Sequence, residues 1–453
     1  MGADPDALQR LRAALPRLAW IDDEGLVTRL SQDYSWFSPI LTPLLAGRRA
    51  DLAVRPRSVD ELQALAAACV RERVPLTLRG SGTGNYGQCT PLQGGVLVDM
   101  TALNQVCWVR DGAVRAQAGA RLGALEAAAR AQGLELRTMP STFRSATVGG
   151  LFGGGFGGVG SINHGPLGAA GNILGVHALA LTEVPERVEL RGADAVALHH
   201  LWGTTGIALE VELALAPAQP WVELVATFAD RDATLAFADR LAQAPGLVKR
   251  NVCVLLQPVP GLLARLADAL PAGEHAVLAV VSAVSEPAVQ ALVAEHGGTV
   301  RLRQDEEQVR RSHRSIIEFC WNHTTLHALK TDPSLTYLQN SFTPGVHLQQ
   351  LRTIAPLLGD EVLWHLEFIR SFDGPTTCTA LPLVRWRDAA RLEEIIALMR
   401  EHGVRVNNPH VNTVEDGKFG GTLPPAVHAL KRRFDPLGLL NPGKMRSWAA
   451  QAG

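Results

Sequence analysis

The sequence predicts an α+β protein of two or three domains, and three observations lead to that prediction. The chain has 453 residues, of which 47% are hydrophobic, which suffices for two or three domains of about 100–200 residues each. Short predicted strands alternate with predicted helices along its length. Two prolines, Pro217 and Pro220, mark a boundary between two such mixed regions.

The composition excludes several classes of protein. With 43 basic and 44 acidic residues the net charge is −1, which argues against nucleic acid or an anionic membrane surface as the main partner. The longest apolar runs, such as residues 276–281, are far shorter than the roughly 20 residues of a membrane span. The N-terminus has no apolar signal core, so we expect a cytoplasmic protein. Six scattered cysteines without a C-x-x-C pair indicate reduced buried thiols.

The region before Pro217 contains clear start and stop signals. Ser58 and Glu61 have the spacing of a capping box at the start of a helix. Gly133 closes a further helix. Helices are expected around 5–18, over 122–131 and after Ser58, where Leu62, Leu65, Ala66, Cys69 and Val70 make one helical face. The expected strands cover 74–80, 95–100, 113–118 and 207–215.

The region after Pro220 also alternates between strands and helices. Expected strands cover 221–228, 275–284 and 361–369. One long helix is predicted over 306–332, because acidic residues occupy its first turn and Asp332 and Pro333 stop it. Near the end, a helix from residue 428 stops at Asp435.

Glycine is the unusual component, with 22 of the 43 glycines between residues 80 and 175. Gly82, Gly84 and Gly87 form a G-x-G-x-x-G pattern after a predicted strand. A Rossmann site is disfavoured, because this pattern must open a helix and here Pro91 and another strand follow. The loop instead offers consecutive backbone N–H groups that can surround an anion such as a diphosphate.

A second glycine cluster places nine glycines between residues 149 and 165. This tract is too apolar for a flexible linker and too irregular for a low-complexity segment. Two separated glycine-rich segments in one domain indicate a long cofactor that lies against bare backbone.

An ordered set of motifs resembles the FAD-linked oxidases and dehydrogenases of the vanillyl-alcohol oxidase (PCMH-type) family. The motifs are R-P-x-S-V-x-E-L, R-G-S-G-T-G, P-S-T with A-T-V-G-G, G-T-T-G-I and D-P-L-G-L-L-N-P-G-K, within residues 50–217 and 434–445. The resemblance implies a two-subdomain PCMH-type FAD-binding domain plus an α+β cap domain with an antiparallel sheet. The expected divisions are 1–217 for the FAD-binding domain (PCMH-type part about 45–217), 218–400 for the cap and 401–453 for a segment returning to the FAD-binding domain.

The resemblance also implies which residues contact FAD. The diphosphate would be held by Arg79, Gly80, Ser81, Gly82, Thr83, Gly84 and Asn85. The ribityl chain and the flavin would contact Pro140, Ser141, Thr147, Gly149, Gly150, Gly157, Gly158 and Ser161. The adenine side would contact Gly203, Thr204, Gly206 and Ile207, and the C-terminal segment would contribute Asn441 and Lys444. Thr83 stands where some relatives tether FAD through a histidine, so non-covalent FAD is expected.

Within that family the chain is most similar to the D-lactate and glycolate dehydrogenase type. The resemblance implies hydride transfer from a 2-hydroxy acid to the flavin, while a base removes the hydroxyl proton. The expected metal signatures, H-x-G-D-G-N-x-H and G-E-H-G, are missing. A divalent metal is therefore possible but not indicated, and the substrate class stays open.

The first catalytic candidates lie on the predicted helix 306–332. Ile316, Cys320, His323, His327 and Lys330 would share one face by their spacing of three to four residues. The two histidines could chelate a metal, hold an oxyanion beside Lys330, or be buried structural side chains.

Four further candidates lie outside that helix. His365 and Glu367 point to the same face of a predicted strand, as an acid/base pair, metal ligands or part of a solvated face. His410, in the turn-rich loop 405–417, is the alternative base. Arg144 could hold a substrate carboxylate or cap the glycine turn.

These observations predict a cytoplasmic FAD-dependent dehydrogenase or oxidase that acts on a small hydroxy compound, foremost a 2-hydroxy acid. One alternative is an FAD oxidase of a sugar, lactone or alcohol that uses oxygen. Another is a non-catalytic flavin-binding subunit of a redox complex. The electron acceptor is unidentified, and a homodimer is left open.

Overall fold

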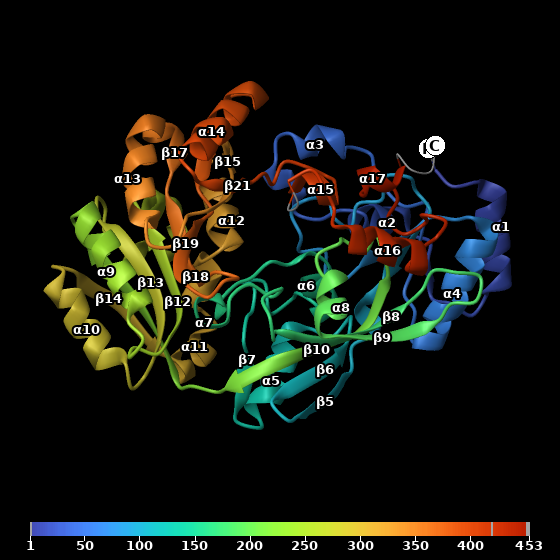
Figure 1. Ribbon diagram of the computed structural model, residues 1–453, viewed down its shortest axis with the longest axis horizontal. Helices are drawn as coiled ribbons and strands as arrows, with labels where there is room; N and C mark the ends of the chain where they lie inside the picture. The colour runs from blue at the N-terminus through green and yellow to red at the C-terminus, as the bar shows by residue number, and fades with distance from the viewer. Residues whose placement is uncertain (1, 418–419, 450–453) are drawn as a thin grey trace.

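The computed structural model describes residues 2–417 and 420–449, which form two halves side by side (Figure 1). The yellow and orange half contains most of the chain from residue 221 to about 407. The blue, green and red half contains the N-terminal 217 residues and the last segment. Parts of the expected domains at residues 1, 418–419 and 450–453 lie outside the described residues. The α+β fold class is confirmed, while the domain limits stay a prediction.

The blue half begins with a four-stranded sheet that orders its strands β1-β2-β4-β3. Strands β2, β4 and β3 are parallel, and β1 is antiparallel to β2. The strands are β1 Trp20–Ile21, β2 Leu52–Val54, β3 Leu76–Arg79 and β4 Val96–Asp99. The glycine loop follows β3 directly, so the carboxyl end of a buried parallel strand delivers it.

A second, antiparallel sheet of six strands follows in the order β5-β6-β10-β8-β9, with β7 paired to β10. The strands are β5 Val106–Arg110, β6 Ala113–Gln117, β7 Leu134–Leu136, β8 Ile173–Leu179, β9 Arg187–Arg191 and β10 Ile207–Pro217. The second glycine tract lies between β7 and β8.

The yellow and orange half is built on an antiparallel sheet of eight strands, in the order β14-β11-β13-β12-β18-β19-β16-β21. These strands are β11 Trp221–Phe228, β12 Lys249–Leu255, β13 His275–Ser282, β14 Thr299–Asp305, β16 Gln339–Ser341, β18 His365–Arg370, β19 Thr376–Ala380 and β21 Arg405–Asn407. A small sheet adds β15 Leu335–Tyr337, β17 Val362–Leu363 and β20 Leu383–Arg385. The antiparallel sheet expected for the cap is confirmed.

Helices cover these sheets in both halves (Figure 1). In the blue, green and red half they are α1 Pro5–Ala14, α2 Glu24–Leu30, α3 Leu41–Leu44, α4 Val59–Glu72, α5 Leu122–Arg130, α6 Val148–Gly154, α8 Gly192–Ala197, α15 Val414–Gly417, α16 Pro425–Phe434 and α17 Arg446–Ala449. The short helix α7 Ser161–His164 packs against β12 and β18 of the cap. In the cap they are α9 Arg231–Gln243, α10 Glu286–Glu295, α11 Glu306–Ser312, α12 Asn322–Thr331, α13 His347–Leu358 and α14 Ala389–Glu401. No described helix is long and apolar enough to cross a membrane.

The predicted capping box at the start of α4 forms only in part. The Ser58 hydroxyl accepts the Glu61 N–H at 3.1 Å, as expected. The Glu61 carboxylate accepts the N–H of Arg57 at 2.6 Å rather than that of Ser58. The helix start is therefore stabilised one residue earlier than the motif specifies.

The eight-stranded sheet buries a different core on each face. Leu366 and Phe368 on β18 pack into a core with α9, α10, α13 and α14. Their neighbour Ile369 belongs to a second core, with residues 316–320 and α12. Burying one such side chain fully contributes about 1.5–3 kcal/mol to folding. Both faces of β18 are therefore covered, and neither is solvated.

The single helix predicted over 306–332 is wrong. The structure divides this segment into α11, a 3₁₀ turn η5 at Ile316–Phe319, and α12. The breaks fall at His313 and Trp321, where φ is 54° and 55°. Such positive values end a right-handed helix. Ile316 and Cys320 therefore do not share a helical face with the histidines of α12.

Two buried carboxylates account for these breaks. Glu223 on β11 accepts the N–H of Ile316 at 2.8 Å, and Glu367 on β18 accepts the N–H of Trp321 at 2.6 Å. Charged acceptors form stronger hydrogen bonds than helix carbonyls do. Because the acceptors come from distant strands, the local sequence pattern did not reveal the interruption.

The strand predicted over 361–369 is also interrupted. Residues 362–363 form β17 in the small sheet, whereas β18 begins at His365 in the large sheet. Between them the Trp364 carbonyl accepts the N–H of Leu256 at 3.0 Å. The strand therefore changes sheets at Trp364.

The C-terminal segment returns to the first sheet. Leu76 N–H donates to the Leu439 carbonyl at 2.8 Å, and Asn441 N–H donates to the Leu76 carbonyl at 2.8 Å. A fully buried ion pair fixes this return, because the Lys431 ammonium contacts both the Asp435 carboxylate and the Thr204 carbonyl. In Figure 1 the red helix α16 accordingly lies beside blue and green elements.

His410 joins three parts of the chain. Its ring contacts the Ser38 hydroxyl at 2.7 Å and the Tyr337 carbonyl at 2.8 Å. Burial lowers the pKa of His410 to about 4. The imidazole is therefore neutral at pH 7 and serves as a hydrogen-bonded bridge between the N-terminal region and the cap.

We expect Asp435→Asn to lower the free energy of unfolding by about 3–5 kcal/mol, because it leaves the Lys431 ammonium buried without its counter-charge. Urea denaturation measures this loss. The matched control is Asp416→Asn, which breaks the exposed pair with Arg446 and should cost about 1 kcal/mol or less. Equal losses of unfolding free energy in the two variants would contradict a stabilising role for the buried Lys431–Asp435 pair.

The pH dependence of stability should carry a contribution from His410. An unfolded histidine has a pKa of about 6.5, so between pH 6.5 and 4 only the unfolded chain binds this proton. The free energy of unfolding should therefore fall as the pH falls, by up to about 1.4 kcal/mol per pH unit from this group. Denaturation of His410→Gln near pH 5 should show a shallower slope than the parent protein. Equal slopes of unfolding free energy against pH in the two proteins would contradict a contribution from His410.

Candidate active site

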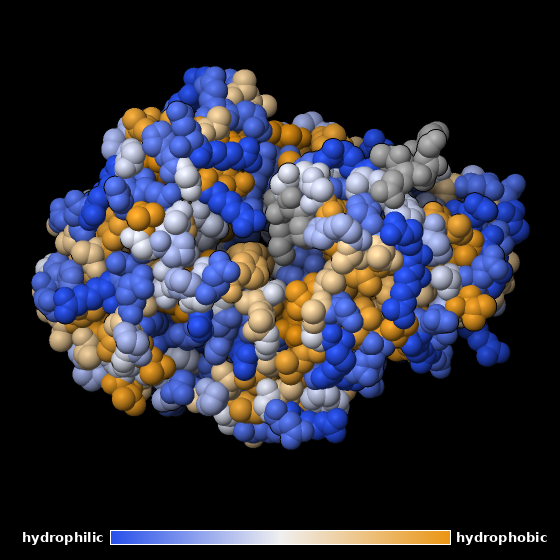
Figure 2. Space-filling view, in the orientation of Figure 1, coloured by the Kyte–Doolittle hydropathy of each residue, from blue (hydrophilic) through white to orange (hydrophobic). Residues whose placement is uncertain are grey.

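A large cavity lies where the glycine segments meet the cap, and on the face shown in Figure 2 the surface is hollowed along the seam between the halves. Its volume is about 2030 Å³, with the open solvent at its mouth included. The lining residues from the FAD-binding half are Asp33, Leu78–Gln88 without Gly87, Cys89, Met100, Ala118, Pro140–Thr142, Ala146, Thr147, Gly149–Gly157, Leu198, His200–Gly203, Thr205, Gly206 and Ala208. The cap contributes Trp321, Asn322, Gln339, Ser341, Thr379, Leu381 and Asn407.

The first glycine loop lines the cavity over all seven residues that the resemblance assigns to it, Arg79 to Asn85. Two of its side chains hold the loop in place. Arg79 donates to the Gln32 carbonyl at 2.8 Å, and Asn85 donates to the Tyr337 hydroxyl at 2.6 Å. Within the described chain, the backbone N–H groups of residues 81–87 donate to no protein acceptor. These N–H groups are therefore the ones available to an anion.

The second glycine tract lies against the first. Pro140, Ser141, Thr147, Gly149, Gly150 and Gly157 line the cavity. Gly158 and Ser161 stand behind this wall, since the Ser161 hydroxyl accepts the Gly158 N–H at 3.0 Å. A Cβ at Gly80 would lie 2.2 Å from Thr147 Oγ1. The two walls are thus packed too closely for a side chain at that point.

The turn at residues 203–207 contributes three of its five residues to the cavity. Gly203, Thr205 and Gly206 line it, whereas Thr204 and Ile207 are fully buried and do not. The Thr204 carbonyl is the acceptor of the buried Lys431 ammonium. This turn is therefore held from behind by the C-terminal segment.

Asn441 and Lys444 are buried beside the cavity without lining it. The Asn441 amide donates to the carbonyls of Gln88 and Trp202, each at 2.8 Å, and so connects two parts of the wall. The Lys444 ammonium has no hydrogen-bond partner in the described part of the chain. Burial lowers the pKa of Lys444 to about 8, and the nearby Asp33 carboxylate opposes that shift.

Asp33 is a cavity residue that the sequence pattern did not indicate. Its Oδ1 accepts the Ser35 N–H at 2.9 Å, and burial raises the pKa of its carboxyl. The described residues offer no partner to Oδ2. Asp33 and Lys444 therefore place one acidic and one basic group at the same end of the site.

The cap contacts the first loop directly. Besides the bond from Asn85 to Tyr337, the Tyr86 hydroxyl donates to Gln339 at 2.6 Å. Gln339 and Ser341 lie on β16, and Thr379, which is opposed to Ser341, lies on β19. Strands of the large sheet therefore close the cavity opposite the glycine segments.

His365 and Glu367 lie together, fully buried, one layer behind that wall. Their Nε2 and Oε1 atoms are 3.0 Å apart. Glu367 also accepts the N–H of Trp321, and the Trp321 indole donates to Asn251 at 3.2 Å. Trp321 lines the cavity, whereas the pair does not. Whether the pair takes part in catalysis stays a prediction.

The other proposed catalytic side chains also lie outside the cavity wall. His327 stacks on Phe319 and contacts the Glu318 carbonyl at 3.1 Å, while Lys330 is exposed. Burial lowers the pKa values of His323 and His327 to about 4. Both histidines are therefore neutral near pH 7.

Arg144 faces the cap rather than the glycine turn. Its guanidinium lies 2.5 Å from the Glu318 carboxylate and also contacts the His313 carbonyl at 3.4 Å. His410 is occupied by the bridge described above. Neither side chain reaches the cavity, and their roles in the reaction stay predictions.

Several cavity residues were missed by sequence reasoning. Gly153 lies inside the glycine tract that had been recognised, and Trp202 immediately precedes the G-T-T-G turn, so a local signal existed for both. Asn322, Gln339 and Asn407 come from separate elements of the cap. Only the sheet brings these three together, and no short motif marks them.

A comparison with protein families matches residues 50–180 to a family described as an FAD binding domain. This range contains the first glycine loop, the second glycine tract and β8. The expected resemblance is therefore confirmed. FAD is the cofactor that the family implies, whereas non-covalent binding stays a prediction.

The chain also resembles curated proteins over most of its length. It is 28% identical to the glycolate oxidase subunit GlcD of Escherichia coli (strain K12) over 435 residues, which cover 87% of this chain and 83% of that protein. It is 24% identical to the GlcD protein of Bacillus subtilis (strain 168), over 87% and 88% of the two chains. A D-lactate dehydrogenase of Archaeoglobus fulgidus is 28% identical over 156 residues, about a third of each chain.

Among solved structures, an alkyldihydroxyacetonephosphate synthase shares the fold with a TM-score of 0.71. The superposition covers 97% of this chain and 86% of that one at 15% sequence identity. It supports the two-part architecture of a PCMH-type FAD-binding domain with a cap. Residues 50–180 thus match the PCMH-type FAD binding domain, and the chain is similar to glycolate oxidase subunits and D-lactate dehydrogenases.

Proposed function

We propose that this protein is a dehydrogenase that oxidises a small hydroxy compound, foremost a 2-hydroxy acid, with non-covalently bound FAD. The observation that carries the proposal is the cavity formed by two glycine walls and a polar cap wall. The names of the GlcD and D-lactate dehydrogenase relatives favour a 2-hydroxy acid as substrate.

The cavity fits a long cofactor with a diphosphate. The free N–H groups of residues 81–87 suit the diphosphate oxygens, because each can donate a charge-assisted hydrogen bond. Two buried polar atoms in the wall, Gln88 Oε1 and Trp202 Nε1, have no partner within the described chain. A bound cofactor with donors and acceptors would satisfy such atoms.

The side chains present support non-covalent attachment of FAD. Thr83 and the other residues of the first loop offer no histidine, and residues 140–150 contain no cysteine. Cys89 lines the cavity, but burial raises the pKa of its thiol to about 11, which keeps it protonated and unreactive. These features support non-covalent binding.

Bound FAD would supply the hydride acceptor for oxidation of the substrate carbon. The chain's own part is to position the substrate against the flavin and to exclude water. Trp321 and Leu381 supply apolar surface, while Asn322 and Ser341 supply hydrogen-bonding groups. The hydroxyl proton needs an acceptor in contact with the substrate. Among the described cavity residues, those with titratable side chains are Asp33, Arg79, Tyr86, Cys89 and His200.

A second candidate substrate class is a neutral hydroxy compound such as a sugar, lactone or alcohol. The specific observation in its favour is that the cap residues lining the cavity are all uncharged. A carboxylate bound there would have to be held by amides and hydroxyls alone, without a counter-charge from the cap.

Anaerobic flavin reduction tests the two classes directly. The flavin-loaded protein is mixed with glycolate, D-lactate, neutral sugars, lactones and alcohols, with and without a chelator, and bleaching of the flavin band is recorded. Bleaching by hydroxy acids supports the proposal, and bleaching by neutral compounds supports the second class. Bleaching by none would favour a non-catalytic flavin-binding subunit. Protein that retains no flavin after reconstitution would overturn the cofactor assignment.

Gly153→Ala should weaken FAD binding without affecting folding. A Cβ at Gly153 meets no protein atom within 4 Å, so it would project into the cofactor's space. Overpacking of this kind costs about 1–3 kcal/mol, or roughly 10- to 100-fold in Kd, measured by titrating apoprotein with FAD. The control Gly123→Ala adds the same methyl group to α5, away from the cavity, and should bind FAD normally. Equal affinities for FAD in the two variants would contradict the placement of the cofactor against Gly153.

Asn322→Asp should distinguish the substrate classes. Asn322 Oδ1 is buried and has no partner among the described residues, so the substitution adds a negative charge with little change of shape. Two like charges about 6 Å apart repel by about 3 kcal/mol at an effective dielectric constant of about 20. We expect KM for a 2-hydroxy acid to rise roughly tenfold or more, with little change for a neutral alcohol. Asn408→Asp, one residue beyond the cavity wall, is the control.

A further inference from the structure

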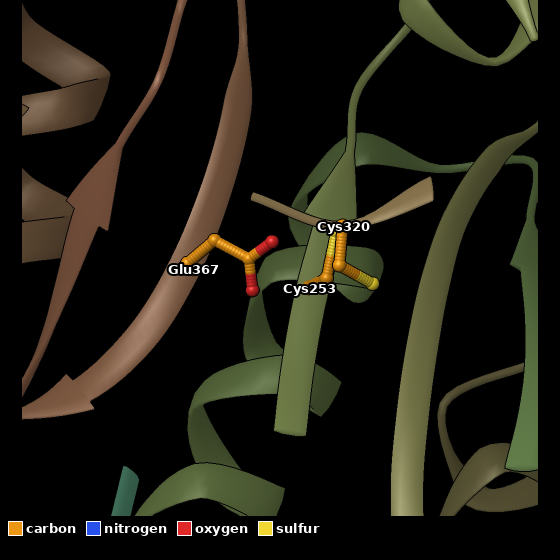
Figure 3. Close-up of side chains that lie close together, drawn as sticks. All are labelled: Cys253, Cys320 and Glu367. Carbon is orange, nitrogen blue, oxygen red and sulfur yellow. The ribbon is translucent and has the colours of Figure 1, made fainter. Parts of the chain in front are cut away.

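A second group of reactive side chains lies behind the cavity, apart from the FAD site. Cys253 on β12, Cys320 after η5 and Glu367 on β18 are each fully buried. One ligand atom from each lies within 4.8 Å of those of the other two. Figure 3 shows the Glu367 carboxylate pointing from its strand toward the two cysteines. In the described part of the chain, this is the one such group of three potential metal ligands.

The register of the sheet creates this proximity. Cys253 and Glu367 are directly opposed across the β12–β18 ladder, so their side chains leave the same face of the sheet. Cys320 approaches that face from the segment that Glu367 itself holds through the Trp321 N–H. The three side chains therefore converge because the predicted helix 306–332 is broken.

The spacing suits a small metal ion. Three atoms no more than 4.8 Å apart all lie within about 2.8 Å of a common point. Zinc binds thiolate sulfur at about 2.3 Å and carboxylate oxygen at about 2.0–2.2 Å. Side-chain rotations that draw each ligand atom inward by about half an ångström would complete three bonds.

A fourth donor, His365, lies beside this group of three but outside it, so its ring would have to rotate to reach a metal bound there. His365 Nε2 lies 3.0 Å from Glu367 Oε1, on the same face of β18. The other ring nitrogen, Nδ1, is buried and has no partner among the described residues. Asn251 lies 3.5 Å from both Cys320 Sγ and Glu367 Oε2, which places a neutral amide beside the group.

We propose that Cys253, Cys320, Glu367 and His365 form a structural zinc site. Two thiolates, one carboxylate and one imidazole are a donor set that selects zinc over magnesium or calcium. The site differs from the relatives' histidine and G-E-H-G signatures, which this sequence lacks. The four residues are fully buried and none of them lines the cavity, so zinc there would hold protein segments together rather than contact substrate.

The consequence of such a site is a rigid wall for the cavity. The ligands come from two strands and from the residue immediately before Trp321, and Trp321 lines the cavity. A metal bound there would fix the position of that indole relative to β12 and β18. Loss of the metal should therefore loosen the cap wall while leaving the glycine walls intact.

Metal analysis of the purified, flavin-loaded protein tests the proposal. We expect about one zinc per chain, and cobalt substitution should give thiolate-to-cobalt charge-transfer absorption in a difference spectrum. Cys253→Ser, Cys320→Ser and Glu367→Gln should each weaken zinc binding by roughly 100-fold or more. Even the loss of a residue that only hydrogen-bonds to a metal ligand lowers metal affinity by about 10–100-fold. Glu367→Gln keeps an acceptor for the Trp321 N–H, so it separates loss of metal from loss of fold.

Cys378→Ser is the matched control, because Cys378 is fully buried on β19 but packs in the other core. It should keep its zinc. Purified protein without zinc that also fails to take up zinc or cobalt would overturn the proposal. A disulfide between Cys253 and Cys320, detected as two missing thiols in the denatured protein, would overturn it as well. Neither outcome depends on flavin reduction, so the test is independent of the proposed reaction.

Discussion

The close approach of two glycine segments is the constraint on which the rest of the structure depends. At Gly80 a Cβ would meet Thr147 at 2.2 Å, and at Gly158 a Cβ would meet the Met139 carbonyl at 1.8 Å. A side chain at Gly80 would force the two segments apart, and one at Gly158 would collide with the backbone at Met139, in both cases by more than a packed interior tolerates. Bare backbone therefore allows the walls to meet, and it leaves N–H groups of the first loop free for a ligand.

The rest of the molecule holds those walls in place from two sides. The C-terminal segment supports them from behind, through the Lys431–Asp435 pair and the amide of Asn441. The cap closes the cavity from the front, through the contact between Asn85 and Tyr337. The contacts of Asn85 with Tyr337, of Lys431 with Thr204 and of Asn441 with Gln88 join residues more than 200 positions apart, so the cavity exists only in the complete fold.

The cap has its own buried polar layer, and Glu367 is its centre. Its carboxylate accepts hydrogen bonds from the Trp321 backbone and faces two thiols and an imidazole. A buried carboxylate is stable only with such partners. The Glu367 carboxylate thus interrupts the chain at Trp321, before α12 begins. It thereby positions the Trp321 indole on the cavity wall and lies among a set of potential metal ligands.

The sequence by itself determined the features that depend on neighbouring residues. The glycine segments, the start of α4, the antiparallel cap and the family could be predicted, because backbone requirements and strand periodicity are local. Only the tertiary structure decided where His365 and Glu367 lie, where the segment 306–332 breaks, and which neutral side chains face the cavity. Their positions depend on carboxylates and strands distant in the chain, and a hydrogen bond between distant residues leaves no periodic signal in the sequence.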